Sequence, residues 1–305
     1  MELASELRKL VGNELVSNDP ETLAAHGGDK WFAAHQPDVV VFARSADDVS
    51  KLLRFASREK IPVTARGGGF GYVGGCVPVC GGIALSLAQM NRINEINFAD
   101  AVAIVEPGVF TADLKAAVRA QKLFYPPDPA SMKDCTIGGN VATNAGGPRC
   151  LKYGVTRNYV IGLEVALANG EVLRTGGRVH KNKTGFDLIG MFVGSEGMLG
   201  VVTEITLRLL PLPPGRATLS AAFATAAKIA CTASAACAAV TNAADKVARA
   251  GGSGSKRSVT SVTTPSIPSE PTNRPTRSKP VLFLCTRPPI RRTSPLASTI
   301  SSPIT

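Results

Sequence analysis

The stretch from Pro126 to Gly147 constrains the fold of this chain most, because it joins a stiff half to a permissive half. Pro126, Pro127 and Pro129 each fix φ and restrict the residue before them, so the first half must run extended. The second half lacks Cβ atoms at four positions, which bracket the small residues 140–145. These positions are Gly138, Gly139, Gly146 and Gly147.

A segment of this kind lets backbone N–H groups approach a large flat or anionic ligand closely. Short polar side chains, which can point into such a site, accompany the glycines. They are Thr136, Asn140, Thr143 and Asn144. Runs rich in Gly and Asn also occur as plain turns. The combination of two Gly-Gly pairs, four polar residues and a proline-stiffened entry favours a binding loop.

The charge of +11 belongs to the C-terminal part of the chain. Residues 231–305 hold ten Lys/Arg against two Asp/Glu, a net of +8, with 23 Ser/Thr and nine Pro. Such a composition buries too little apolar area to offset backbone entropy, so we expect disorder there. The character of the amino-acid sequence changes abruptly near residues 222–231, as a shifted reading frame would produce. The basic tail leaves open that the chain binds nucleic acid or another anionic surface. Residues 1–230 carry no such excess of positive charge, and we expect no nucleic-acid partner.

The seven cysteines form no C-x-x-C pair, which fits neither a disulfide framework nor a zinc or iron–sulfur site. We therefore expect no metal. Arg8 and Lys9 interrupt the first apolar positions, which excludes a signal peptide. The sequence has no apolar run of 18 residues, so we expect no transmembrane segment and a cytoplasmic location.

The first half alternates strands and helices. The leucine spacing after Leu3 predicts an amphipathic helix, and residues 39–43 predict a buried strand. Ser45 is a good N-cap for a helix reaching about Arg58, and residues 61–65 predict the next strand. Strand, helix and strand within thirty residues indicate a parallel β-α-β unit.

The second of these strands opens into the glycine-rich loop 66–75. Residues 69–74 match G-x-G-x-x-G literally, but a nicotinamide-binding loop needs a helix to begin there and an acidic residue about twenty positions on. Pro78 follows instead of a helix start, and residues 83–87 predict another strand. We therefore interpret the loop as a nest of backbone donors beside Arg66, suited to a pyrophosphate.

The second half is rich in hairpins. Residues 93–98 and 102–105 predict short strands, and Thr111 is expected to cap the next helix. Asn169-Gly170 between two apolar runs signals a type I′ hairpin. A glycine-rich turn at 194–200 feeds a strand over 201–209. A β-α-β half followed by a hairpin-rich half predicts an α+β fold with a cleft between the halves.

The three histidines have no spaced partner. His26 and His35 are expected to be surface or ordinarily bonded side chains, whereas His180 lies in a polar basic loop and is a candidate to line the site. No Ser-His-Asp order or H-E-x-x-H motif occurs. The catalytic residues stay unassigned.

The motifs in combination resemble the flavin-binding domain of the vanillyl-alcohol oxidase/p-cresol methylhydroxylase (PCMH) superfamily, and within it the FAD subunits of glycolate oxidase and D-lactate dehydrogenase. The resemblance covers about residues 37–214. It rests on the loop 66–76, the segments 126–131 and 136–147, and the motifs 152–154, 181–188 and 194–204, which follow in the expected order.

The resemblance implies a two-subdomain, PCMH-type fold, with a small β-α-β subdomain, a larger mixed or antiparallel sheet with helices, and FAD between them. No histidine stands where covalently flavinylated members carry one, so it implies noncovalent FAD. Phe70, Tyr72 and Val73 replace smaller or hydroxyl-bearing residues of many members. The implied cofactor-binding residues are Arg66, Gly67, Gly68, Gly69, Phe70, Gly71, Gly74, Gly75, Pro127, Asp128, Ser131, Thr136, Gly138, Gly139, Asn140, Ala142, Thr143, Asn144, Gly146, Gly147, Glu196, Gly197, Gly200, Val201 and Val202.

The expected organisation is a helical segment over 1–36, the FAD-binding domain over 37–214, the start of a substrate (cap) domain over 215–230 and the low-complexity tail over 231–305. The resemblance implies oxidation of a small 2-hydroxy acid, glycolate or D-lactate, to the 2-oxo acid by hydride transfer to flavin, with an iron–sulfur subunit as an electron-transfer partner. Family members continue into a cap that binds the substrate. The alternative is therefore a truncated flavin-binding module that does not turn over.

Overall fold

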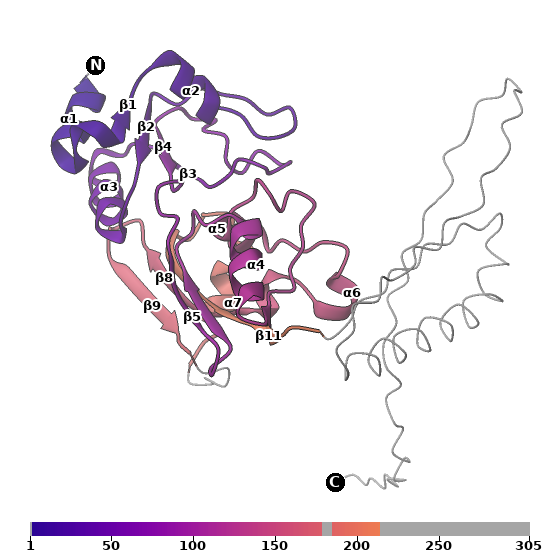
Figure 1. The fold of residues 1–305 in the computed structure, drawn as a ribbon. Coiled ribbons are helices and arrows are strands. Elements are labelled where there is room, and N and C mark those ends of the chain that lie inside the picture. The colour runs from indigo at the N-terminus through magenta and orange to yellow at the C-terminus, as the bar shows by residue number, and fades with distance from the viewer. Residues whose placement is uncertain (1, 179–184, 214–305) are drawn as a thin grey trace, which may run out of the picture. The chain divides into compact units, whose positions relative to one another are not determined.

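The described residues, 2–178 and 185–213, form two main β-sheets with helices in a computed structural model (Figure 1). They belong to one compact unit, Met1–Arg216. The expected cap start at 215–230, the low-complexity tail and His180 lie outside the described residues.

The first sheet contains the predicted parallel unit. β2 and β3 run parallel, but both pair with β4, which lies between them in the order β1-β2-β4-β3. β1 adds to the edge antiparallel to β2, so the segment before residue 37 contributes a strand as well as helices. The strands are β1 (Val16–Ser17), β2 (Val39–Phe42), β3 (Val63–Arg66) and β4 (Ile83–Ser86).

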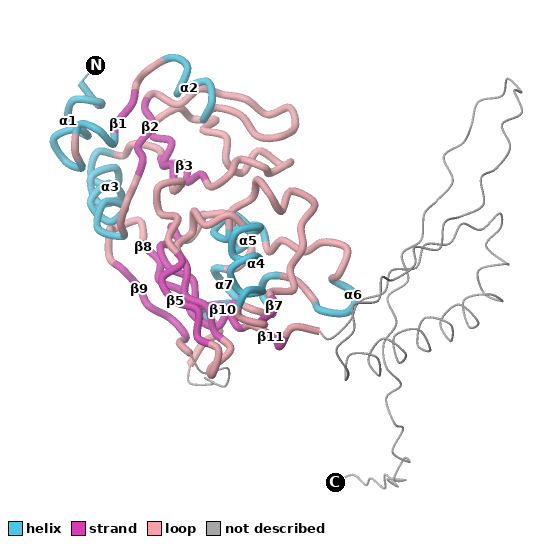
Figure 2. Tube along the Cα trace, viewed as in Figure 1, coloured by secondary structure: helices cyan, strands magenta, loops and turns pink. Residues whose placement is uncertain are grey.

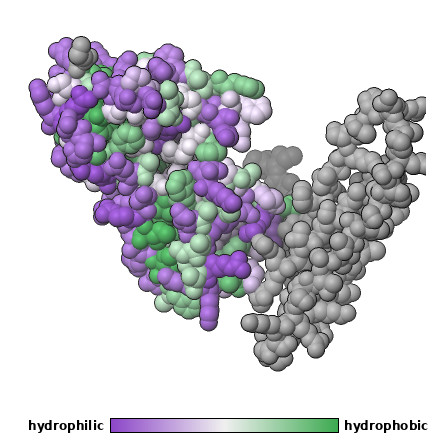
Figure 3. All heavy atoms as spheres, turned by 45° about the horizontal axis from the view of Figure 1, so that its top comes forward, coloured by the Kyte–Doolittle hydropathy of each residue, from purple (hydrophilic) through white to green (hydrophobic). Residues whose placement is uncertain are grey.

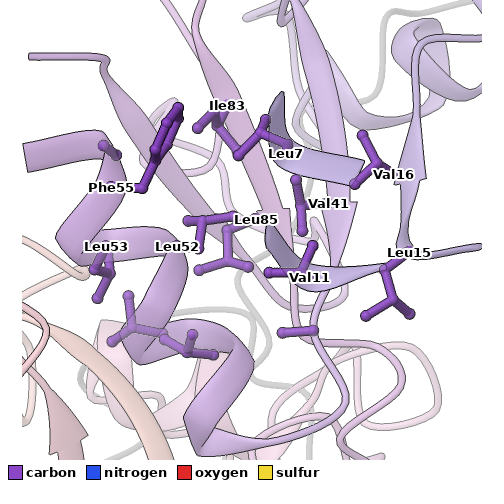
Figure 4. Close-up of a cluster of buried hydrophobic side chains, with 14 of the residues drawn as sticks. Leu7, Val11, Leu15, Val16, Val41, Leu52, Leu53, Phe55, Ile83 and Leu85 are labelled. Carbon is purple, nitrogen blue, oxygen red and sulfur yellow. The ribbon is translucent and has the colours of Figure 1, made fainter. Parts of the chain in front are cut away.

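Helices cover this sheet. Ser45 caps α3 as predicted, since its hydroxyl accepts a hydrogen bond from the Asp48 amide at 3.2 Å. Leu7, Leu52 and Leu85 are fully buried in the shared core, which Figure 4 shows between α1, α3 and the strands. The helices of this half are α1 (Glu2–Val11), the 3₁₀ turn η1 (Asn13–Leu15), α2 (Pro20–His26) and α3 (Ala46–Glu59).

The second sheet is antiparallel throughout, in the order β5-β6-β10-β8-β9 (Figure 2). Every residue of β8 is buried, whereas β10 alternates between buried and half-buried residues, as expected for a strand with one face in the core. A two-stranded sheet of β7 and β11 accompanies it. The strands are β5 (Ile93–Asn97), β6 (Val102–Val105), β7 (Leu123–Phe124), β8 (Val160–Ala166), β9 (Val172–Gly176), β10 (Val201–Arg208) and β11 (Leu210–Pro211).

Short helices share a second core with this sheet. Leu114, Ile137 and Phe192 come from three different helices and meet Leu163 and Ile205 of the strands there. In Figure 1, α4, α5 and α7 lie on the same side of the sheet. The helices are α4 (Thr111–Ala120), α5 (Ile137–Thr143), α6 (Cys150–Tyr153), the 3₁₀ turn η2 (Thr156–Asn158) and α7 (Leu188–Phe192).

Two local predictions are wrong in detail. The β8–β9 hairpin is present, but of the two turn residues only Gly170 has a positive φ, whereas type I′ needs both. The Gly170 amide donates to the Leu167 carbonyl, so the turn is of type I followed by a left-handed glycine. The N-cap of α4 is Phe110, because the Thr111 hydroxyl donates instead to the Cys135 carbonyl at 3.1 Å.

The two halves touch through α3 and the β8–β9 hairpin. The Ser50 hydroxyl and, at 3.4 Å, the Arg54 guanidinium both donate to the Gly170 carbonyl. Ala166 and Val201 of the second sheet are buried in the first core. The predicted α+β class with two joined halves is therefore confirmed.

The surface shown in Figure 3 is mostly hydrophilic, with hydrophobic side chains gathered in limited patches. Within the described residues, no helix is both long and apolar enough to span a membrane.

Candidate flavin site

A small cavity of about 60 Å³ lies between the two sheets. Its walls come from the end of β3, the start of β10, α5 and the turn that precedes β10. The walls therefore combine the glycine-rich loop 66–75, the segment 126–147 and the glycine-rich turn 194–200 of the sequence analysis. The lining residues are Ala65, Arg66, Gly67, Leu87, Pro107, Thr136, Gly138, Gly139, Ala142, Phe192, Ser195, Glu196, Gly197, Gly200, Val201 and Val202.

The first glycine loop packs directly against the second segment. A Cβ on Gly67 would lie 2.4 Å from the Thr136 hydroxyl, and one on Gly68 would lie 2.2 Å from the Asp134 carbonyl oxygen. Neither glycine has a positive φ, so the requirement is for space. Only glycine allows these two backbones to approach this closely.

The loop carries backbone donors that the protein does not use. No helix begins after β3, which confirms the rejection of a nicotinamide-binding loop. Among the described residues, the amides of Gly67, Gly68, Gly69 and Phe70 donate to no protein acceptor. A row of free amides in a concave backbone suits a pyrophosphate, so these residues fit the cofactor that the family resemblance implies.

The Arg66 guanidinium is held by carbonyls of the N-terminal segment and lies against the loop, since a Cβ on Gly69 would be 2.2 Å from Nη2. Nη1 donates to the Gly28 carbonyl at 2.7 Å and lies 3.5 Å from the Cys76 sulfur, and Nη2 donates to the Ala25 carbonyl at 3.3 Å. Burial raises the pKa of Cys76, and the nearby Arg66 charge opposes that rise. Arg66 therefore fastens the loop to the N-terminal segment, while its backbone lines the cavity.

The second glycine segment is not one loop, because residues 137–143 form α5. The Thr136 hydroxyl caps this helix by accepting from the Gly139 amide at 3.2 Å. The Gly138 amide donates to the Pro107 carbonyl at 2.8 Å. The amides of Gly138 and Gly139 are thus used within the protein.

Most polar side chains of this segment also serve the fold. Asn140 is buried and donates to the Thr111 hydroxyl at 2.7 Å, which links α5 to α4. The Thr143 hydroxyl donates to the Gly139 carbonyl at 3.0 Å, and the Asn144 side-chain oxygen accepts from the Arg157 amide at 3.0 Å. These three side chains therefore hydrogen-bond within the protein, and their contact with a cofactor stays a prediction.

The turn before β10 closes the cavity. Glu196 has φ +51, in the left-handed region, and its amide donates to the Ala142 carbonyl of α5 at 2.9 Å. Its carboxylate lies beside the first glycine loop, since a Cβ on Gly75 would meet it at 2.6 Å. One acidic side chain therefore stands at the edge of the predicted pyrophosphate loop.

Asp128 is the centre of a group that we call the Asp128 cluster, made of Lys115, Asp128 and Arg149. Its carboxylate contacts Lys115 Nζ at 2.5 Å and Arg149 Nε at 3.1 Å. Burial lowers the pKa of Lys115, and the Asp128 carboxylate opposes that change. The Asp128 amide donates to the Gly146 carbonyl at 3.2 Å, and a Cβ on Gly147 would collide with the Asp128 carbonyl oxygen at 2.0 Å.

The cavity gathers part of the predicted set. Arg66, Gly67, Thr136 and the turn residues line it, as do five residues that the sequence did not single out, among them Leu87 and Phe192. An apolar residue that the fold brings to the cavity wall from a distant strand or helix has no sequence pattern around it that indicates a binding site. Predicted residues that do not line it are Gly68, Gly69, Phe70, Gly71, Gly74, Gly75, Pro127, Asp128, Ser131, Asn140, Thr143, Asn144, Gly146 and Gly147.

His26 and His35 make ordinary contacts, with Nδ1 of His26 bonded to the Thr22 carbonyl at 2.9 Å and Nδ1 of His35 to the Gln36 carbonyl at 3.1 Å. Burial lowers the pKa of His26. Over residues 2–178 and 185–213, no three His, Cys, Asp or Glu side chains gather as a metal site.

Comparison with known proteins agrees with this geometry. The family model described as FAD binding domain matches residues 37–176. Residues 37–176 are an FAD-binding domain. Its fold is of the p-cresol methylhydroxylase type: the solved structure of p-cresol methylhydroxylase with substrate bound superposes with a TM-score of 0.60 at 27% identity, over 70% of this chain and 44% of that one.

Two curated relatives bear on the activity. This FAD-binding chain is 50% identical, over 61% of its length, to glycolate oxidase subunit GlcD of Bacillus subtilis, and 41% identical, over 68%, to D-lactate dehydrogenase of Anaerostipes hadrus. It spans 40% and 42% of the length of these relatives. The resemblance to this family of FAD-linked oxidoreductases is thus confirmed over the domain that holds the flavin.

Proposed function

We propose that the chain is an FAD-dependent oxidoreductase of the glycolate oxidase subunit type, which oxidises a small 2-hydroxy acid, glycolate or D-lactate, to the 2-oxo acid. The row of free amides at Gly67–Phe70, packed against Asp134 and Thr136, is the observation that carries the proposal. The names of the relatives supply the substrate class.

In this proposal the residues of the chain hold and orient FAD. The amides of Gly67–Phe70 bind the pyrophosphate, and the remaining predicted residues surround the rest of the cofactor. When bound, FAD would supply the hydride acceptor for the carbinol carbon, and the hydroxyl proton would pass to a base. The electrons then pass to an acceptor, for which we propose an iron–sulfur partner subunit.

A second candidate function is FAD binding without turnover. Of the described residues that line the cavity, only Arg66 and Glu196 have charged side chains, and the Arg66 guanidinium donates to backbone carbonyls. A base for the substrate hydroxyl is thus not evident on the described walls unless Glu196 serves. This observation favours a binding module that relies on another polypeptide segment for catalysis.

One measurement separates the candidates. The absorption spectrum of the purified chain is recorded before and after anaerobic addition of glycolate or D-lactate. We expect a flavin spectrum that bleaches with one of the acids. A flavin spectrum that persists with both supports the second candidate, and a folded chain that takes up no FAD overturns both.

A further inference from the structure

The turn that precedes β10 contributes one charged residue to the cavity wall, Glu196. Its backbone has φ +51, and the next residue, Gly197, has φ +81. Glycine adopts this left-handed conformation without the steric cost that a side chain brings. A residue with a side chain therefore stands where a glycine would be less strained, and such an exception points to a role for the side chain.

The Glu196 carboxylate makes no hydrogen bond or ion pair within residues 2–178 and 185–213. It lies against the first glycine loop, because a Cβ on Gly75 would be 2.6 Å from its Oε2 atom. Glu196 also lines the same cavity as Gly67, the first residue of the loop with free amides. An unpartnered carboxylate thus adjoins the backbone donors that fit a pyrophosphate.

The amides and the carboxylate need opposite partners. Backbone amides donate hydrogen bonds and suit the phosphates, whereas an ionised carboxylate only accepts hydrogen bonds and repels a phosphate. In a dinucleotide, the donors nearest to the pyrophosphate are the hydroxyls of the adjoining sugars. In nicotinamide sites, a carboxylate near the phosphate loop accepts from the ribose 2′-hydroxyl. Here the fold brings Glu196 to the loop from about 120 positions later in the chain.

We propose that the Glu196 carboxylate accepts hydrogen bonds from the ribose hydroxyls in the ADP half of FAD. This inference rests on the proposed function, because it needs the amides of residues 67–70 to bind the pyrophosphate. It makes Glu196 a residue that selects a ribose, which explains a side chain at a left-handed position. A carboxylate engaged in this way does not serve as the base for the substrate hydroxyl, so that base belongs to another segment.

The test measures binding to the full chain, freed of flavin, by calorimetry with ADP and its 2′-deoxy and 3′-deoxy forms. We expect the wild type to bind ADP roughly 10- to 100-fold more tightly than a deoxy form, the range for a hydrogen bond to a charged group. The ratio of affinities is the readout, because removing a negative charge from Glu196 also changes the attraction for the phosphates.

Two variants of the turn and one control complete the test. Glu196→Gly suits the left-handed backbone and removes the carboxylate, so it should bind ADP and the deoxy forms alike. Glu196→Gln keeps a neutral acceptor and should retain a smaller preference for ADP. Glu6→Gln removes an exposed carboxylate of α1 and should show the preference of the wild type.

The outcomes separate this inference from the proposed function. Equal binding of ADP and both deoxy forms by the wild type overturns the inference alone, as does an unchanged preference in Glu196→Gly. Glu196→Gln with full flavin content but without the bleaching that the wild type shows would make Glu196 the base, which also overturns it. A wild type that prefers ADP and holds FAD, but bleaches with neither acid, supports the inference while the proposed oxidation fails. A wild type that binds neither ADP nor FAD overturns both.

Discussion

At the scale of single residues, the site depends on glycines, which have no Cβ atom. Gly67 and Gly68 allow two backbones to meet with no room for a methyl group, and the amides that this contact leaves free are the donors of the proposed pyrophosphate loop. The glycine pattern in the sequence pointed to this loop, whose binding of a pyrophosphate stays a prediction. It did not reveal which glycines are needed for space, because that depends on the distant Asp134 and Thr136.

We predict that Gly68→Ala loses FAD and lowers the free energy of unfolding by about 1–3 kcal/mol, because the new methyl group would overlap the Asp134 carbonyl. Thermal denaturation and the flavin absorbance per chain measure both effects. Gly177→Ala is the matched control, since open space surrounds that position and it lies outside the predicted binding set. Equal flavin content in the two variants would contradict the steric explanation.

A second prediction at this scale concerns the fully buried Tyr125. Burial raises the pKa of its phenol, so the native state keeps the proton when the unfolded chain has lost it. Stability from this group is complete below pH 10 and falls above it, by at most about 1.4 kcal/mol per pH unit. Tyr125→Phe should lack this part of the alkaline loss in urea titrations at pH 8 to 11. Tyr72→Phe, at an exposed position, should follow the wild type.

At the scale of elements, α3 and α5 show what sequence patterns can and cannot predict. The first has an N-cap serine and a regular apolar face, so its position followed from local rules. Helix α5 contains two adjacent glycines, each of which costs about 1 kcal/mol in a helix, so its sequence predicts a loop. It is helical because Ile137 and Val141 are buried one turn apart and Gly138 fits against Pro107, contacts that only the folded chain supplies.

The hydrogen bond that links α4 to α5 is testable. Thr111→Val leaves the buried Asn140 amide without its acceptor, so we expect a loss of about 1–3 kcal/mol of unfolding free energy. Thr143→Val, in α5 and exposed, should change stability by less than about 0.5 kcal/mol. Urea denaturation of both variants provides the comparison. Similar losses would mean that the link does not stabilise the pair of helices.

At the scale of the whole described unit, the two halves meet at residues that carry no local signal of this contact. The Gly170 carbonyl of the β8–β9 hairpin accepts from Ser50 and Arg54 of α3, about 120 positions earlier in the chain. The hairpin itself was evident from its turn residues, but its partner helix was not. Contacts between elements distant in sequence are what local patterns leave undetermined.

We therefore predict that Gly170→Ala weakens the joint between the halves. Gly170 has φ +80, and a Cβ there would lie 2.7 Å from the Ser50 carbonyl oxygen. The expected loss is about 1–3 kcal/mol, and Trp31 fluorescence and circular dichroism should still give one coincident transition. Gly177→Ala, with open space around it, should melt as the wild type does. Separated transitions in the wild type would show that the halves unfold independently.

The path of the chain between β3 and β4 has an evolutionary consequence. These strands are parallel neighbours, so residues 67–82 must cross back along the sheet, and they do so without a helix. A crossover needs about ten residues or more, yet each doubling of a flexible loop costs only about 0.6 kcal/mol. We therefore expect insertions after the packed glycines of this loop to be tolerated better than large deletions. Descendants of this domain are free to lengthen the loop that holds the ligand, and so to diversify what they recognise, while inheriting the sheet unchanged.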